Sequence, residues 1–279
     1  PYAVLFLFPS LGEIQKVLHK VSFDLNPGEV LALVGESGSG KSVTAHSILQ
    51  LLPSPAARYS TESSILFKGK EIIGAKKSFL NGLRGNHVGM IFQEPMTSLN
   101  PLHNIEKQIC EGLIVHQGMS HTRAKKRCLE LLDLVRIPNA KSRLSAYPNE
   151  LSGGQRQRVM IAMALANDPD VLIADEPTTA IDVTIQKQIL ALLEDIRTEL
   201  EMAILFITHD LGVVKHFAQR VLVMHLGEIV ESGAALDVLT SPQQPYTQSL
   251  VSAEPQGNPT PIADNAPIAI ETKDLKVWF

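Results

Sequence analysis

The sequence predicts an α/β protein with a mainly parallel core sheet, and two observations support this fold class. The first is an alternation of short apolar runs with helix-compatible stretches in the second half of the chain. The apolar runs cover residues 171–174, 203–207 and 220–225, and the helical stretches cover 184 to about 200 and the residues from 211 onward. Such alternation is typical of strands and crossover helices in a parallel sheet. The second is the apolar run Val30–Val34, which precedes a glycine-rich segment and a helix-compatible stretch that reaches to about residue 52, before Pro53.

The first part of the chain is rich in expected strands, and helices follow it. The segment YAVLFLF at residues 2–8 ends before Pro9 and is expected to form a strand. Further strands are expected near 65–67 and 88–92. From 104 to 117 and from 121 to 136, apolar residues recur at helical spacing, which predicts two helices packed on a core. These residues are Ile105, Ile109 and Leu113 in the first stretch, and Leu129, Leu132 and Val135 in the second.

Composition sets the outer limits. With 279 residues, of which 44% are hydrophobic, the chain can form one large domain or two modest ones. No apolar run approaches the roughly 18 residues needed to cross a bilayer. Cys110 and Cys128 are the only cysteines, and they give neither a disulfide framework nor a metal-ligand spacing. A formal net charge of −4 gives no general attraction to nucleic acid.

The glycine-rich segment GESGSGKS at residues 35–42 predicts a phosphate-binding loop. Between a strand and a helix, such a loop turns several backbone N–H groups toward one anion. Lys41 is then expected to reach the β- and γ-phosphates, and the Ser42 hydroxyl to bind Mg²⁺. An ordinary surface turn is the alternative, and the flanking strand and helix argue against it. The residues expected to contact ATP here are Gly35, Glu36, Ser37, Gly38, Ser39, Gly40, Lys41, Ser42 and Val43.

Two carboxylates follow the apolar run at 171–174. Asp175 is expected to hold the metal, and Glu176 to orient or deprotonate an attacking water. Taken alone, such a pair is more often a solvated strand end. Its combination with the phosphate loop favours the catalytic interpretation.

The chain resembles the nucleotide-binding subunits of ATP-binding cassette transporters over about residues 6–251. The resemblance rests on five elements in the order of that family: the phosphate loop, Gln93 of IFQEP, LSGGQ at 151–155, the Asp-Glu pair, and His209 of FITHD. It implies a P-loop NTPase fold that uses ATP and Mg²⁺. In that fold the mainly parallel core sheet carries an antiparallel β subdomain and an inserted α-helical subdomain, here at about 97–168.

The resemblance also implies a role for each matching residue in catalysis. Gln93 is expected to contact Mg²⁺ or the attacking water, Glu176 to be the catalytic carboxylate, and His209 to contact the γ-phosphate. The expected metal set is Ser42, Gln93 and Asp175.

Further positions are expected to act across a dimer of two such domains. Residues of the LSGGQ segment look like donors that reach the ATP bound by the opposite partner, and Asp182 looks like the residue that couples the two sites. Phe8 fits best as the aromatic that stacks on adenine, with Phe6 next, and a core role for either is equally open. The LSGGQ residues concerned are Ser152, Gly153, Gly154 and Gln155.

Four segments resemble the oligopeptide, dipeptide and nickel importers of bacteria: GESGSGKS, FQEPMTSLNP, YPNELSGGQRQRVMIAMAL and SPQQPYTQSL. This implies a subunit that powers peptide import through integral membrane permease subunits, with a periplasmic binding protein involved indirectly. Its implied place is peripheral, on the cytoplasmic face of the inner membrane. No cysteine follows Cys128, so we expect no iron–sulfur cluster. The alternative is a cassette ATPase of DNA repair or translation, but no coiled coil, zinc module or basic linker supports it.

The expected organisation has three parts. Residues 1–252 form the cassette, the Pro- and Asn-rich residues 253–269 form a linker, and 270–279 (IETKDLKVWF) resemble the strand that opens a second cassette. This predicts the amino-terminal half of a tandem protein, like the double-cassette subunits of microcin C and peptide importers. A carboxyl-terminal strand of the first domain is the alternative for 270–279.

Overall fold

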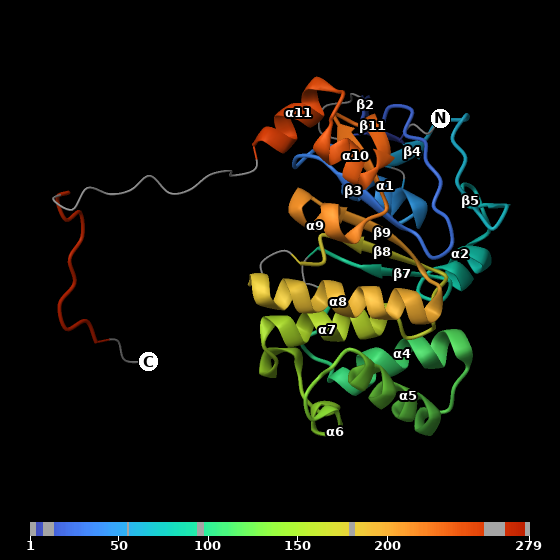
Figure 1. Ribbon diagram of the computed structural model, residues 1–279. Helices are drawn as coiled ribbons and strands as arrows, with labels where there is room; N and C mark the ends of the chain where they lie inside the picture. Colours follow the sequence, from blue (N-terminus) through green and yellow to red (C-terminus); the bar gives the residue numbers. More distant parts are fainter. Residues whose placement is uncertain are drawn as a thin grey trace.

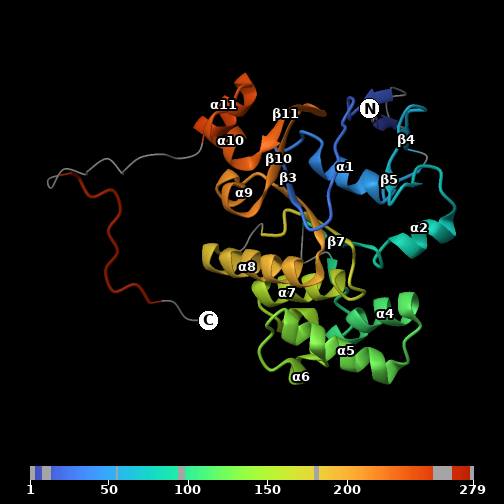
Figure 2. The same cartoon turned by 45° about the vertical axis from the view of Figure 1, so that its right-hand side comes forward.

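The structure, a computed structural model, describes residues 4–7, 14–54, 56–93, 98–178, 182–253 and 266–276. Of residues 4–7, 14 and 15, only the backbone is described. Figure 1 shows a central sheet with α7 and α8 on one side of it and the helices α4 to α6 beyond them. The view turned by 45° in Figure 2 shows the same order of layers.

The core sheet has six strands in the order β11-β10-β3-β9-β8-β7. All neighbouring strands pair in parallel except β11, which is antiparallel to β10. This confirms the predicted mainly parallel sheet. The strands are β3 (Val30–Val34), β7 (Val88–Ile91), β8 (Val171–Asp175), β9 (Ala203–Thr208), β10 (Arg220–His225) and β11 (Glu228–Ala234).

Two small antiparallel sheets accompany the first part of the chain. One has the order β2-β1-β4, and the other pairs β5 with β6. The strands are β1 (Val4–Leu7), β2 (Ile14–Lys16), β4 (Ala57–Tyr59), β5 (Leu66–Phe67) and β6 (Lys70–Glu71). They match the expected antiparallel β subdomain. Of the strand expected at 2–8, residues 4–7 form β1 and the others lie outside the described residues, whereas the strand expected at 65–67 begins one residue later.

Helix α1 (Lys41–Ile48) begins directly after Gly40 and is shorter than the sequence predicts. Gln50 has φ +52°, in the left-handed region, so the chain leaves the helical path before it reaches Pro53. A second short helix, α2 (Lys77–Leu83), precedes β7.

The inserted helices form the expected helical subdomain. They are α4 (Ile105–Gln117), α5 (His121–Leu134), α6 (Ala140–Arg143), the 3-10 helix η1 (Pro148–Glu150) and α7 (Gly153–Ala164). Asn104 caps α4 by accepting from Lys107 N, and Gly118 ends it with φ +61°. Of the apolar residues that predicted α4 and α5, all are buried except Leu129, which is partly buried. Cys110 and Cys128 are buried and free, and burial raises the pKa of both thiols.

The rest of the chain supplies the helices that cover the sheet. They are α8 (Val183–Leu200), α9 (Leu211–Phe217), α10 (Ala235–Thr240) and α11 (Pro245–Ser252). Among the described helices, none combines the length and the apolar character that a membrane crossing requires.

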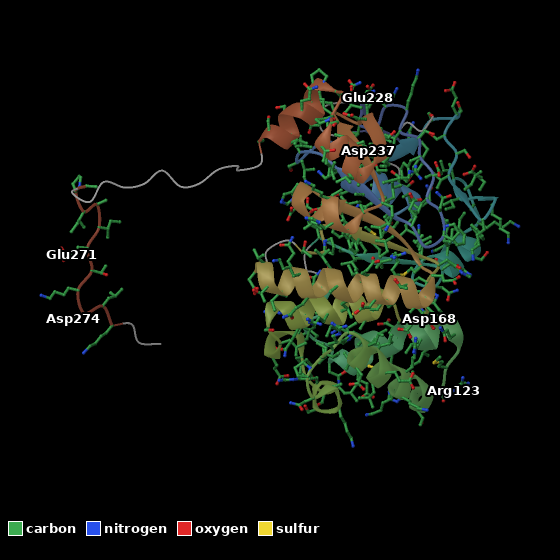
Figure 3. The ribbon with its side chains drawn as sticks, viewed as in Figure 1. Arg123, Asp168, Glu228, Asp237, Glu271 and Asp274 are labelled. Carbon is green, nitrogen blue, oxygen red and sulfur yellow. The ribbon has the colours of Figure 1, made fainter. Side chains whose placement is uncertain are left out.

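Residues 266–276 form neither a helix nor a strand, and all of them are exposed. Glu271 and Asp274 mark this segment in Figure 3. The strand expected over 270–279 is therefore not formed at 270–276, because a strand needs a neighbour for its backbone hydrogen bonds and no strand described in this chain pairs there. The end of that expected strand and most of the expected linker, 254–265, lie outside the described residues.

Candidate nucleotide site

The loop at 35–42 connects the fully buried β3 to the start of α1 and depends on glycine. Gly35, Gly38 and Gly40 have φ values of +150°, +82° and +106°. A Cβ added to Gly35 would lie 2.2 Å from the carbonyl oxygen of Met224, and one on Gly40 would lie 2.9 Å from Leu18 Cδ2. Both the backbone path and the close packing therefore exclude larger residues.

Lys41 lies inside this loop and is only 6% exposed. Its Nζ donates to the carbonyl oxygens of Gly35 and Glu36, both at 2.8 Å. Burial lowers the pKa of Lys41, while the carboxylates of Glu176, Asp175 and Glu36 act in the opposite direction. A buried ammonium at the start of a helix is a suitable partner for a polyphosphate.

Ser39 gives a second indication that the loop fits an anion. Its hydroxyl is buried and has no hydrogen-bond partner among the described residues. A buried hydroxyl without a partner is costly, and a phosphate oxygen would accept a hydrogen bond from it. Glu36, Ser37 and Gly38 are exposed and form the rim of the loop.

Ser42 and Asp175 come together at the end of the loop. Ser42 Oγ donates to Asp175 Oδ1 over 3.2 Å. Asp175 ends β8 and is 2% exposed. This burial raises the pKa of Asp175, although the hydrogen bond from Ser42 acts in the opposite direction. A hydroxyl and a carboxylate are ligands that a hard divalent cation prefers, so this pair could hold Mg²⁺.

Glu176 lies between Gln93 and His209. Gln93 Nε2 donates to Glu176 Oε2 over 3.1 Å, and His209 Nδ1 lies 3.3 Å from Glu176 Oε1. The Glu176 backbone has φ +47°, unusual for a residue with a side chain, and its N–H donates to the carbonyl of Ile207 on β9. The structure therefore brings together all three residues expected to be catalytic, next to Asp175 and the loop.

The LSGGQ residues lie at the start of α7, in the helical subdomain. Ser152 Oγ accepts from Gln155 N over 3.3 Å, and Gln155 Oε1 accepts from Ser152 N over 3.1 Å, which is a capping box. Within the described part of the chain, the hydrogen bonds of Ser152–Gln155 lie in α7 and its cap. Ser152 and Gly153 are exposed, so this helix start is open to solvent.

Asp182 caps the neighbouring helix α8, where its Oδ1 accepts from Ile185 N over 2.9 Å. A Cβ on Gly154 would lie 3.0 Å from Ile185 Cγ2, so the starts of α7 and α8 are packed together. Asp182 and the LSGGQ segment are therefore neighbours.

The adenine-stacking residue stays a prediction. Phe8 lies outside the described residues, and of Phe6 only the backbone position in β1 is described.

One contact of the loop was not predicted from the sequence. The hydroxyl oxygen of Tyr246, in α11, accepts a hydrogen bond from the Glu36 backbone N–H over 3.1 Å. The sequence singles out SPQQPYTQSL only as a resemblance, with no chemistry attached to its tyrosine.

The fold is similar to that of a solved ATP-binding cassette. A solved dimeric structure of the ATP-binding cassette MJ0796, in a post-hydrolysis state bound to ADP and Pi, is 28% identical. It superposes with a TM-score of 0.72 over 84% of this chain and 99% of that one.

Two curated relatives are closer in sequence. The peptidoglycan transport ATP-binding protein YejF of Agrobacterium fabrum is 58% identical over 96% of this chain and 49% of its own length. The oligopeptide transport ATP-binding protein OppD of Bacillus subtilis is 51% identical over 88% of this chain and 68% of its own. The chain thus spans about half the length of YejF. The ABC transporter family model matches residues 18–179, which is more than half of the chain, and the chain therefore belongs to the ABC transporter family.

Proposed function

We propose that this chain binds and hydrolyses ATP and thereby powers the import of peptides or peptide-like compounds through a membrane permease. One observation carries the ATPase part of the proposal. The phosphate loop with its buried Lys41, the Ser42–Asp175 pair, and Glu176 between Gln93 and His209 all lie together at the ends of adjacent core strands. This is the set of groups that phosphoryl transfer to water requires.

Binding of the triphosphate is assigned to the loop. Its backbone N–H groups and the start of α1 face the phosphates, Lys41 neutralises the β- and γ-phosphates, and Ser39 donates its unpaired hydroxyl. Ser42 and Asp175, with Gln93, would hold Mg²⁺, which neutralises charge on the phosphates when bound.

Hydrolysis is assigned to the Glu176 cluster. The Glu176 carboxylate orients an attacking water and takes its proton, because it is the carboxylate nearest to the amide and imidazole groups that would flank the γ-phosphate. Gln93 holds one carboxylate oxygen and positions the water. His209 lies beside the other oxygen, from which its ring can reach the γ-phosphate.

The site requires a second cassette, either as a homodimer or in tandem. The open start of α7, with Ser152, Gly153, Gly154 and Gln155, is a suitable anion-binding position that the loop of the same chain does not use. The dimeric ADP-bound state of the MJ0796 cassette supports this arrangement. Asp182, at the neighbouring helix start, would then couple the two sites.

The transported class is inferred from relatives. Their names specify peptidoglycan transport and oligopeptide transport, and a glutathione importer of Pectobacterium atrosepticum is 47% identical over 91% of this chain. These names favour import over the alternative of DNA repair or translation. As part of the same proposal, the partners are permease subunits and, indirectly, a periplasmic binding protein, and the place is peripheral, on the cytoplasmic face of the inner membrane.

The domain organisation is part of the same proposal. We assign 1–252 to one cassette, with a helical subdomain at about 97–168, 253–269 to a linker, and 270–279 to the start of a second cassette.

The test is to reconstitute the full-length protein with its neighbouring permease in lipid and to measure ATPase activity with and without peptides. We expect peptides or peptidoglycan fragments to stimulate hydrolysis, and a Glu176→Gln protein to show no stimulation. Stimulation by DNA ends or ribosomes, with none by any peptide pool, would reject import as the function.

A further inference from the structure

Helix α11 packs against the core sheet close to the phosphate loop. Tyr246, Leu250 and Val251 lie against an apolar cluster formed by β3, β10, α9 and α10. Figure 1 shows α11 beside α10, at the end of the folded body. The residues before α11 are held by Glu231 of β11, whose carboxylate oxygens accept from the N–H groups of Gln243 at 2.8 Å and Gln244 at 3.1 Å. The helix therefore has a fixed position relative to the sheet.

This position places Tyr246 between the sheet and the loop. Its ring stacks on His225, at the end of β10, with centroids 3.9 Å apart and an angle of 30° between the planes. Its hydroxyl oxygen accepts from the Glu36 N–H over 3.1 Å. The stacking fixes the ring, and the ring holds its oxygen at the entrance of the loop.

The Glu36 N–H and the Gly35 carbonyl belong to the same peptide unit. The carbonyl accepts from Lys41 Nζ over 2.8 Å, while the N–H donates to Tyr246. Because a peptide unit is planar, its N–H cannot turn without turning the carbonyl. Gly35 carries no side chain that would restrain this plane, so the restraint comes from Tyr246 on one side and Lys41 on the other.

We infer that Tyr246 is a positioning residue of the ATP site, which acts through the Gly35–Glu36 peptide to hold Lys41 in place before the nucleotide arrives. The inference rests on the proposed function and adds α11 to the residues that set nucleotide affinity. Loss of the hydroxyl frees the peptide plane and leaves Lys41 with one fixed acceptor, Glu36 O. Nucleotide binding must then order the loop, which weakens affinity.

The variant that tests this is Tyr246→Phe, which keeps the ring on His225 and in the apolar cluster and removes only the hydroxyl. In the full-length protein, we expect the Kd for Mg–ATP, measured by calorimetry, to rise about 3- to 10-fold, the loss expected for one hydrogen bond. The kcat at saturating ATP should stay within about twofold, because the groups assigned to hydrolysis are Glu176, Gln93 and His209 and the change removes none of them. The unfolding midpoint should not change.

Tyr59→Phe is the matched control. The Tyr59 hydroxyl contacts the carbonyl of Ser47, near the far end of α1, at 3.5 Å, so its loss should leave the Kd unchanged. Hydrogen exchange at the Glu36 amide gives a readout that does not require ATP. It should be faster in Tyr246→Phe than in the wild type or in Tyr59→Phe.

The outcomes separate the inference from the proposed function. If the wild type does not bind Mg–ATP, the proposed function fails, whereas the exchange of the Glu36 amide still tests the contact. An unprotected Glu36 amide in the wild type would overturn the inference. An unchanged Kd in Tyr246→Phe would also overturn it. The same holds if the Kd rises equally in Tyr59→Phe and both variants have a lower unfolding midpoint.

Discussion

Ser42 Oγ donates a hydrogen bond to Asp175 Oδ1 over 3.2 Å, although 133 positions separate them in the sequence. Ser42 lies in the first turn of α1, and Asp175 is the last residue of β8. The contact therefore joins the glycine-rich loop to the strand end that is followed by Glu176, the proposed catalytic carboxylate. It also places two oxygen ligands where a cation bound to the phosphates would lie.

Ser42→Ala should remove the dependence of ATP affinity on Mg²⁺. The variant loses one oxygen ligand and the group that orients the other, and loss of such partners typically weakens metal binding about 10- to 100-fold. ATP affinity measured with Mg²⁺ and with EDTA should differ strongly in the wild type and little in the variant. Ser142→Ala, at a hydroxyl in the helical subdomain, is the control. A full Mg²⁺ effect in Ser42→Ala would exclude Ser42 as a ligand.

Glu176→Gln should retain ATP binding and lose turnover. The amide keeps the size of the side chain but cannot take a proton, and loss of a general base typically costs about 10²- to 10⁴-fold in rate. ATP that is bound but not hydrolysed should hold two cassettes together as a closed dimer, visible by size-exclusion chromatography. Glu199→Gln, an exposed carboxylate of α8, should hydrolyse ATP normally. If the Glu176→Gln protein hydrolyses ATP at the wild-type steady-state rate, Glu176 is not the general base.

Two glycine substitutions should have opposite effects on stability. Gly35→Ala places a Cβ against the Met224 carbonyl at a positive φ, so it should lower the free energy of unfolding by about 2 kcal/mol or more and abolish ATP binding. Gly82 lies inside α2 with open space around it, so Gly82→Ala should raise the free energy of unfolding by about 0.5–1 kcal/mol. Urea unfolding measures both. Equal effects of the two substitutions would show that the loop does not require glycine at 35.

The sequence predicts those parts of the site that depend on local pattern. A glycine-rich loop after an apolar run requires left-handed backbone, and Gly35, Gly38 and Gly40 adopt it. The carboxylates after 171–174 follow from the strand that carries them. Gln93, Glu176 and His209 lie on separate segments, so no local pattern predicts that they come together. This was expected only because the order of the motifs resembles a known family.

Other features could not be read from the sequence because they depend on tertiary packing. Tyr246 and Glu36 are 210 positions apart, and a tyrosine that accepts from a backbone N–H leaves no pattern in residue type. The early end of α1 results from the left-handed Gln50, which helix propensity does not reveal. The strand at 270–279 was expected from a resemblance to the opening strand of a cassette, but no described strand of the chain pairs with 270–276.

Asp175→Asn should change how stability depends on pH in Mg²⁺-free buffer. Burial raises the pKa of Asp175 above its ordinary value of 3.8, so in the folded state the carboxyl keeps its proton to a higher pH than in the unfolded state. As pH rises from about 3.8 through the higher folded value, the unfolded state binds fewer protons than the folded state, and the wild type loses stability. Asparagine does not ionise and still accepts from Ser42. The free energy of unfolding of the variant, relative to the wild type, should therefore be near zero at low pH and increase as pH rises through this window.

Urea unfolding from acidic to neutral pH measures this difference, with the exposed Asp133→Asn as the control. Adding Mg²⁺ at neutral pH should reverse the order, because the cation binds the ionised carboxylate of the folded wild type and stabilises it by mass action. A constant difference between Asp175→Asn and the wild type across the whole pH range would mean that burial of this carboxylate does not govern its ionisation. A Mg²⁺ effect of equal size in both proteins would show that the cation binds elsewhere.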